Sequence, residues 1–390
     1  MNRPVFHPTA EQLDVTNRAI ARWIERIRQH PDQRAGAYPY TLFHAPGAPI
    51  YGTVLMFHGF SARPHQMWRL ADYLFRNGFN VYQVNLTGHA FLNPDKNWAQ
   101  VDLIPEIANP LKAKVQSDPV LRNYLQHVME NPQGFTRPGY MQRLALVARL
   151  IAIEPRLLDI MKAAEQPQDP DFDRYFLSSH MNYLTDAQAR LAELDALPGP
   201  VFTVGLSVGG AVALGLAAAH PERVKRVVAY APLLRIYGED RRRYVNLAGP
   251  LDISESGWDP NLRFPVGCLT AAERFGASYV LSATSLRSLQ STPTFLTLTE
   301  NEDAADIETN QTLFSKLGGR DRGHYLHLYP AQDLVPHPMV DPTEVSQNMS
   351  NRFWQSLYQE TYRFLSSGSV DLQNLGNLEQ SPDLPLVPPV

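Results

Sequence analysis

The sequence contains a single cysteine, Cys268, among 390 residues. No disulfide can form within the chain, so nothing in the sequence requires an oxidising compartment. An excess of charge of one sign is also lacking, because 35 Lys and Arg residues stand against 39 Asp and Glu residues, for a net charge of -4. Proteins that bind nucleic acid usually carry a basic excess, so this balance disfavours a nucleic-acid partner.

Long apolar runs are absent as well. No stretch approaches the roughly 18 consecutive apolar residues of a membrane-spanning helix, so no transmembrane segment is expected. Residues 1–30 are polar and amphipathic and lack the apolar core of a secretory signal, which predicts a cytoplasmic protein. The Cys/His spacings of metal sites and the Gly-rich loops that bind phosphate are missing too, so we expect no metal and no cofactor.

What the sequence does contain is an alternation of short apolar runs and helical patterns. Strands are predicted over 38–45, 52–57, 79–85, 200–206, 224–231, 294–299 and 323–329. Helices are predicted over 9–30, 64–77, 207–220, 307–317 and 343–365. This order predicts an α/β fold with a mostly parallel central sheet flanked by helices. Chemistry is then expected in the loops at the carboxyl ends of the strands.

Two insertions interrupt the alternation. Residues 93–180 carry helical patterns and are expected to form a large helical cap over the site, whereas residues 232–291 are expected to be irregular and to add a second wall. The apolar residues of 141–164 indicate either an apolar substrate moiety or simple packing of the cap. The predicted core is therefore 1–92, with its N-terminal helix, and 181–366. The Pro-rich tail, 367–390, is expected to be disordered.

The strongest motif is Gly-Leu-Ser-Val-Gly at residues 205–209, which contains G-x-S-x-G. It lies between a predicted strand and a helix of small residues, which is the context that a nucleophile elbow requires. Gly205 and Gly209 would let strand and helix approach, Ser207 would be the nucleophile, and the Val208 N–H would bind a developing oxyanion. The alternative is a Gly/Ser-rich turn without chemistry.

Two longer runs carry a family resemblance. VLMFHGFSARPHQMWRLADYLFRNGFNVYQVNLTGH and VFTVGLSVGGAVALGLAAAHPERVKRVVAYAPLL resemble the α/β-hydrolase superfamily, and most of all its serine esterase, monoacylglycerol lipase and cinnamoyl-esterase-like members. The resemblance covers about 38–92, 182–234 and 292–365. It implies that the Phe60 N–H is the second oxyanion donor. His58, on the same loop, is expected to hold that loop rather than to act as the base.

A serine nucleophile needs a histidine base, and the histidine needs a carboxylate that orients it. In this family the order along the chain is Ser, acid, His. Of the downstream histidines, His324 and His327 fall at a predicted strand, whereas His337 lies in the loop where the family places its base. The acid should follow the strand 294–299, where four candidates crowd together: Glu300, Glu302, Asp303 and Asp306. Family spacing favours Asp303, with Asp306 second and otherwise a helix N-cap.

These residues predict a serine hydrolase that cleaves carboxylic esters through a Ser207–His337–Asp303 triad and an acyl-enzyme. The expected partner is a small-molecule ester, with an apolar moiety if the cap helices line the pocket. A thioesterase or acyltransferase on the same fold stays open, as does a hydrolase fold that binds without catalysis.

Overall fold

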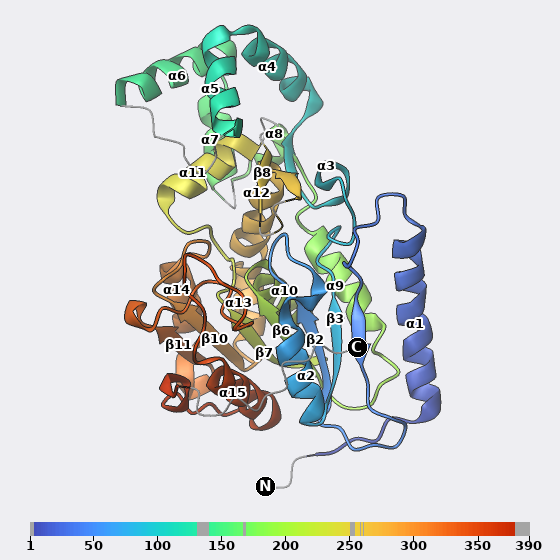
Figure 1. Ribbon diagram of the computed structural model, residues 1–390. Coiled ribbons are helices and arrows are strands. Elements are labelled where there is room, and N and C mark those ends of the chain that lie inside the picture. Colours follow the sequence, from blue (N-terminus) through green and yellow to red (C-terminus); the bar gives the residue numbers. More distant parts are fainter. Residues whose placement is uncertain are drawn as a thin grey trace.

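A seven-stranded sheet forms the centre of the computed structural model, which describes residues 4–130, 140–166, 169–249, 254–257, 259 and 261–378 (Figure 1). The strand order is β1-β3-β2-β6-β7-β10-β11, and only β1 runs antiparallel to its neighbour. The strands are β1 (Tyr40–Leu42), β2 (Gly52–Phe57), β3 (Phe79–Val84), β6 (Val201–Leu206), β7 (Val224–Tyr230), β10 (Thr294–Thr299) and β11 (Tyr325–Tyr329). The predicted mostly parallel sheet is therefore confirmed.

Helices cover both faces of the sheet. They are α1 (Ala10–Gln29), η1 (Pro64–Met67), α2 (Trp68–Arg76), α9 (Asn182–Ala192), α10 (Val208–Ala219), α13 (Ala283–Leu289), α14 (Ile307–Leu317) and α15 (Trp354–Ser367). The last helix begins at Trp354 rather than at 343. Residues before it form turns, since Asn351 Nδ2 donates to the Met339 carbonyl and Asn351 Oδ1 accepts from the Phe353 N–H. These side-chain bonds compete with helical ones.

The core lies on both faces of the sheet. In β2, Leu55 and Phe57 belong to the apolar cluster that includes α9 and α10, whereas Val54 and Met56 belong to the cluster that includes α2 and α15. Successive side chains of a strand point to opposite faces, so a strand covered on both faces is buried along its whole length and consists mainly of apolar and β-branched residues. This explains why β2, β3, β6 and β10 are continuous buried runs.

The described residues of the segment 93–180 form a largely helical layer at one end of the molecule (Figure 1). Its elements are α3 (Pro94–Asn97), β4 (Val101–Leu103), α4 (Pro105–Ser117), α5 (Pro119–Glu130), α6 (Tyr140–Ile153), α7 (Leu157–Glu165), α8 (Phe172–Tyr175) and β5 (Phe176–Ser178). The second insertion is not irregular as expected. It contains α11 (Glu239–Ala248), β8 (Ser254–Ser256), β9 (Arg263–Pro265), α12 (Val266–Arg274) and the π-helical turn η3 (Phe275–Val280), and α11 packs against α7.

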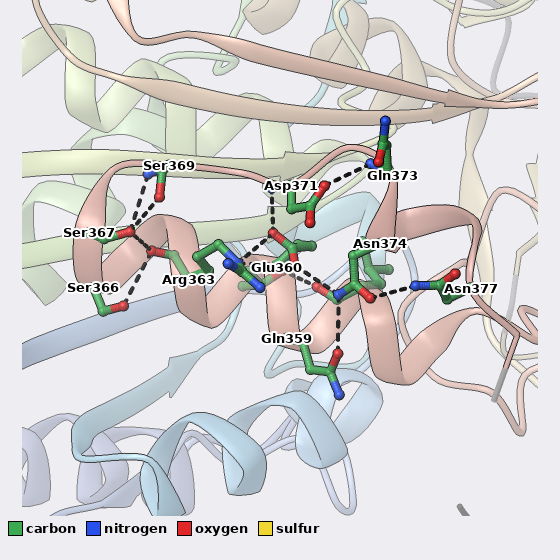
Figure 2. Close-up of polar contacts among 12 residues, drawn as sticks. Gln359, Glu360, Arg363, Ser366, Ser367, Ser369, Asp371, Gln373, Asn374 and Asn377 are labelled. Carbon is green, nitrogen blue, oxygen red and sulfur yellow. Dashed lines mark hydrogen bonds and ion pairs between the residues drawn. The ribbon is translucent and has the colours of Figure 1, made fainter. Parts of the chain in front are cut away.

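The chain after α15 is folded back on that helix (Figure 2). Fully buried Glu360 accepts from the Asp371 N–H at 2.7 Å and from Asn374 Nδ2 at 2.8 Å, and Arg363 pairs with it at 3.0 Å. Leu375, in η6 (Asn374–Gly376), is also fully buried. The expected disorder is therefore wrong for 367–378, because a buried carboxylate and an apolar side chain anchor this segment. Residues 379–390 lie outside the described residues.

Within the described part of the chain, no helix is both long enough and apolar enough to cross a membrane.

Candidate active site

Ser207 lies in the tight turn between β6 and α10, at the carboxyl end of the sheet. Its backbone has φ 57° and ψ -121°, a strained conformation for a residue with a side chain. Ser207 is held there because its N–H donates to the Tyr230 carbonyl at 2.9 Å and its own carbonyl accepts from the N–H groups of Ala211 and Leu233. Such strain is typical of functional turns.

The two motif glycines are required by close backbone contacts. A Cβ on Gly205 would lie 2.1 Å from the Gly209 carbonyl oxygen. A Cβ on Gly209 would lie 2.2 Å from the Phe57 oxygen and 2.4 Å from the His58 oxygen. Only glycine permits this approach. The contact brings the His58–Gly59–Phe60 loop directly against the serine turn.

The two predicted oxyanion donors are placed on this pair of turns. Val208 is the first residue of α10, where backbone N–H groups have no acceptor within the helix. Among the described residues, no protein acceptor takes the N–H of Val208 or that of Phe60. The Phe60 ring packs edge-on against Trp98, at 5.3 Å between centroids, and against Phe264, at 4.9 Å. These contacts immobilise the loop that carries the Phe60 N–H.

His58 is buried and holds the loop, as expected. Its Nδ1 bonds to the Gly59 carbonyl at 2.8 Å, and its Nε2 accepts from the Leu86 N–H at 3.2 Å. Burial lowers the pKa of His58 to about 3. The ring is therefore neutral, with one nitrogen as donor and the other as acceptor.

His337 lies in the loop after β11 and faces Glu302, in the loop after β10. The distance from His337 Nδ1 to Glu302 Oε1 is 2.6 Å, although the ring N–H is not aligned with that oxygen in this structure. The His337 side chain is 12% exposed and the Glu302 side chain only 1% exposed. Glu302 Oε1 also accepts from the N–H groups of Ala304 and Ala305, at 2.9 and 3.0 Å, which hold the carboxylate in place.

The environment favours the charged form of His337. Burial by itself lowers the pKa of this histidine, but the adjacent charge of Glu302 and the contact with it outweigh burial, and the charge of Asp303 adds to them. The net effect raises the pKa of His337 above its ordinary value. A histidine whose protonated form is stabilised by a buried carboxylate is suited to accept a proton from a nucleophile.

The other acidic candidates have other hydrogen-bond partners. Asp303 is exposed, and its Oδ2 accepts from Gln347 Nε2 at 2.8 Å. Asp306 is the N-cap of α14, as expected, and accepts from the Thr309 N–H at 2.8 Å. Glu300 accepts from the Ala331 N–H at 2.9 Å. The residue predicted as acid, Asp303, is thus next to the carboxylate that contacts His337, and not that carboxylate itself.

Asp303 lies close to Glu302 and His337, and these three residues together could be interpreted as a metal site. One ligand atom each of Glu302, Asp303 and His337 lies within 4.8 Å of the others, a spacing that a metal ion could bridge. Glu302 Oε1, however, is already occupied by backbone N–H donors, and Asp303 Oδ2 by Gln347. Hydrogen bonds that hold both carboxylates to protein donors fit an orienting acid better than a metal ligand.

Ser207 and His337 line one cavity of about 350 Å³. Phe60, Leu206, Leu233, Phe264 and Leu269 form its apolar wall, and its polar lining includes Ser61, Gln66, Arg241, Glu255, Ser256, Asp303 and Ser346. Arg241 and Glu255 are paired through both guanidinium NH groups. The second insertion supplies the wall from 241 to 269. Among the described residues that line this cavity, none belongs to 93–180, which favours the alternative that the apolar residues of this segment pack the cap.

Residues 52–248, just over half of the chain, match the family model of the alpha/beta hydrolase fold. The protein belongs to the α/β-hydrolase family. A search of curated proteins finds no match.

Several solved structures are similar to this chain. A structure of the metagenome-derived lipolytic enzymes LipS and LipT has 15% sequence identity and a TM-score of 0.50, with 85% of this chain and 98% of that chain covered. A soluble variant of the Saccharomyces cerevisiae monoglyceride lipase has 14% identity and a TM-score of 0.45, with 88% and 98% covered. Est1E from Butyrivibrio proteoclasticus, with bound ferulic acid, has 11% identity and a TM-score of 0.45, with 84% and 93% covered. At these identities the likeness concerns the fold.

Proposed function

We propose that this α/β hydrolase is a serine hydrolase that cleaves carboxylic esters of small molecules. The observation that carries the proposal is the placement of a strained Ser207 and a carboxylate-paired His337 on one cavity, next to two backbone N–H groups without protein acceptors. Family membership supports hydrolase chemistry, and a serine at the elbow supports an acyl-enzyme.

The residues divide the reaction among them. Ser207 Oγ attacks the ester carbonyl carbon while His337 Nε2 takes its proton, and the carbonyl π electrons move to the oxygen. The N–H groups of Phe60 and Val208 bind that oxyanion. When the tetrahedral intermediate collapses, the bond to the alcohol oxygen breaks and His337 returns the proton to the leaving alcohol. Water, deprotonated by His337, then releases the carboxylic acid and regenerates Ser207.

We assign the orienting acid to Glu302 in place of Asp303. The assignment rests on the 2.6 Å separation from His337 Nδ1, on the burial of Glu302, and on the N–H groups that hold its carboxylate. A buried carboxylate orients the imidazole and stabilises its charged form more strongly than an exposed one, because water screens the exposed charge.

The cavity also bears on the substrate. Its apolar wall of Phe60, Leu206, Leu233, Phe264 and Leu269 fits an apolar acyl or alcohol group, whereas Arg241 and Glu255 place polar atoms at another part of the lining. We expect moderately apolar esters to be better substrates than very long chains, since a cavity of about 350 Å³ limits the size of the bound group.

A cytoplasmic location stays a prediction from the sequence.

A fluorophosphonate probe tests the proposal directly. Native protein should be labelled, with the modification mapped to Ser207, whereas Ser207→Ala should not be labelled. A panel of p-nitrophenyl esters of increasing chain length then measures the reaction. Native protein without labelling and without hydrolysis of any ester in the panel would favour a binding protein instead.

A further inference from the structure

Gln66, in η1, lies between the loop of the oxyanion donor and the loop of the histidine. Its Oε1 accepts from the Gly59 N–H at 2.8 Å, and its Nε2 donates to Glu344 Oε2 at 3.2 Å. Gly59 directly precedes Phe60, and Glu344 follows His337 by seven positions in the same loop region. An amide oxygen must face an N–H donor, so the amide of Gln66 has only one orientation that satisfies both partners.

The peptide groups around Gly59 explain why this contact matters. The Gly59 carbonyl and the Phe60 N–H belong to one planar trans peptide and point in opposite directions. His58 Nδ1 bonds to that carbonyl at 2.8 Å, and Gln66 holds the preceding peptide through the Gly59 N–H. Gly59 lies between these two peptides and, without a side chain, restricts their relative rotation least.

We propose that Gln66 is a positioning residue, which together with Glu344 holds Gly59 so that the Phe60 N–H points into the catalytic cavity. This inference rests on the proposed function, because it assigns Gln66 a role in the oxyanion hole. Without Gln66, the remaining hydrogen bonds at Gly59 are those that its carbonyl makes with His58 Nδ1, at 2.8 Å, and with the Ala62 N–H, at 3.3 Å. The peptide before Gly59 then loses its side-chain acceptor, and the Phe60 N–H can rotate away from the oxyanion. Gln66 lines the same cavity, so its removal acts at short range.

The partner of Gln66 accepts in either protonation state. The pKa of the Glu344 carboxyl is raised to about 8, because burial outweighs the hydrogen bond from Gln66, which lowers it, and the charge of Asp341 adds to the effect of burial. A neighbouring cavity of about 320 Å³ adds charged groups near the pair, namely Arg34, Arg63 and Asp259. Since both a carboxylate and a carboxyl carbonyl accept from Nε2, the contact survives across neutral pH.

Three variants separate positioning from simple stability. Gln66→Met keeps the length of the side chain but removes the acceptor of the Gly59 N–H. Glu344→Gln keeps an acceptor for Gln66 Nε2. The double variant Gln66→Glu with Glu344→Gln exchanges the two side chains. The carboxylate at position 66 then accepts from the Gly59 N–H, and the amide at position 344 donates to that carboxylate. Gln311→Met, at an exposed position of α14, is the matched control for the substitution itself.

We expect Gln66→Met to lower kcat on a p-nitrophenyl ester by about tenfold to a hundredfold with KM changed less than about threefold, as for a weakened oxyanion contact. The exchange variant should recover kcat to within about threefold of native protein, and Glu344→Gln should stay near native. Hydrogen exchange of the 58–61 peptide should accelerate in Gln66→Met but not in Gln311→Met.

The idea is wrong if Gln66→Met keeps native kcat, if the exchange variant does not recover, or if exchange of the 58–61 peptide is unchanged. A native protein that reacts with neither ester nor probe would instead contradict the proposed function. In that case the exchange measurement still decides whether Gln66 restrains the loop.

Discussion

Replacing Glu302 by Gln should remove most of the activity, whereas the isosteric change Asp303→Asn should not. Glu302 lies 2.6 Å from His337 and is almost fully buried, while Asp303 is exposed and contacts Gln347. Loss of the carboxylate that orients a catalytic histidine costs about 10³–10⁴-fold in kcat, which corresponds to about 4–5.4 kcal/mol of transition-state stabilisation. For Asp303→Asn we expect less than about a threefold change, because water screens its charge.

The same pair of variants should differ in pH dependence. His337 must be neutral to accept a proton, so kcat/KM rises with pH through the pKa of His337, and in native protein this limb should be centred above the ordinary value of 6.5. Without the charge of Glu302, burial lowers the pKa and the limb should move to lower pH. Asp303→Asn should move it in the same direction but less, because Asp303 is the smallest contributor.

The free energy of unfolding should depend on pH in the opposite direction to kcat/KM. Because the pKa of His337 is raised in the folded state, the pair with Glu302 stabilises the fold fully below the unfolded-state pKa of about 6.5. That contribution is lost as pH rises through the folded-state pKa. This loss of stability with rising pH should be absent in Glu302→Gln, which lacks the charged partner of His337.

Steady-state hydrolysis of a p-nitrophenyl ester from pH 5 to 9 measures both effects, and thermal unfolding of each variant serves as the control. The Gln side chain keeps an oxygen for the Ala304 and Ala305 N–H groups, so Tm should change little above the pKa of His337. Below that pKa, Tm of Glu302→Gln should fall, because the variant lacks the charged pair. The assignment would be refuted if Asp303→Asn lost the larger part of kcat while Glu302→Gln stayed near native.

Two further predictions concern stability. Gly209→Ala places a Cβ 2.2 and 2.4 Å from backbone oxygens at the end of β2, so unfolding free energy should fall by about 3 kcal/mol or more, whereas Gly376→Ala, with open space around its Cα, should unfold like native protein in urea. Deleting 368–390 removes two of the three partners of buried Glu360, Asp371 and Asn374, and also the buried Leu375, and should cost about 3 kcal/mol, so Tm should fall further than after deletion of 379–390 alone. Equal Tm values for the two truncations would contradict this.

The parts of the fold that the sequence predicted well are those set by local pattern. The strands 52–57 and 294–299 and the helix 307–317 have the predicted bounds, because buried strands are short runs of apolar and β-branched residues and because Asp306 caps the helix. The helix predicted from 343 begins at Trp354, since side-chain bonds of Asn351 to distant backbone replace helical bonds. Such bonds depend on which loops meet in space.

The carboxylate that faces His337 likewise depends on tertiary contacts rather than on local sequence. Four acidic residues follow β10 within seven positions, and spacing alone favoured Asp303. Which of them faces His337 depends on how two loops pair: Asn301 bridges to Pro336, and Thr299 Oγ1 donates to the Val335 carbonyl. This pairing turns Glu302 inward and leaves Asp303 at the surface. The local sequence does not distinguish Glu302 from its acidic neighbours, because the groups that donate to its carboxylate are the backbone N–H groups of Asp303, Ala304 and Ala305, which almost any residue would supply.

By itself, the sequence determined the α/β architecture and the serine turn at residue 207, because strand periodicity, helix caps and the glycines of a tight turn act over a few residues. Tertiary structure decided which carboxylate contacts the histidine, how Gln66 and His58 bind Gly59, and which insertion forms the cavity wall. These depend on pairs such as Gln66 and Glu344, which are far apart in the chain and meet only once the sheet has assembled. Their contacts leave no local pattern that a sequence could display.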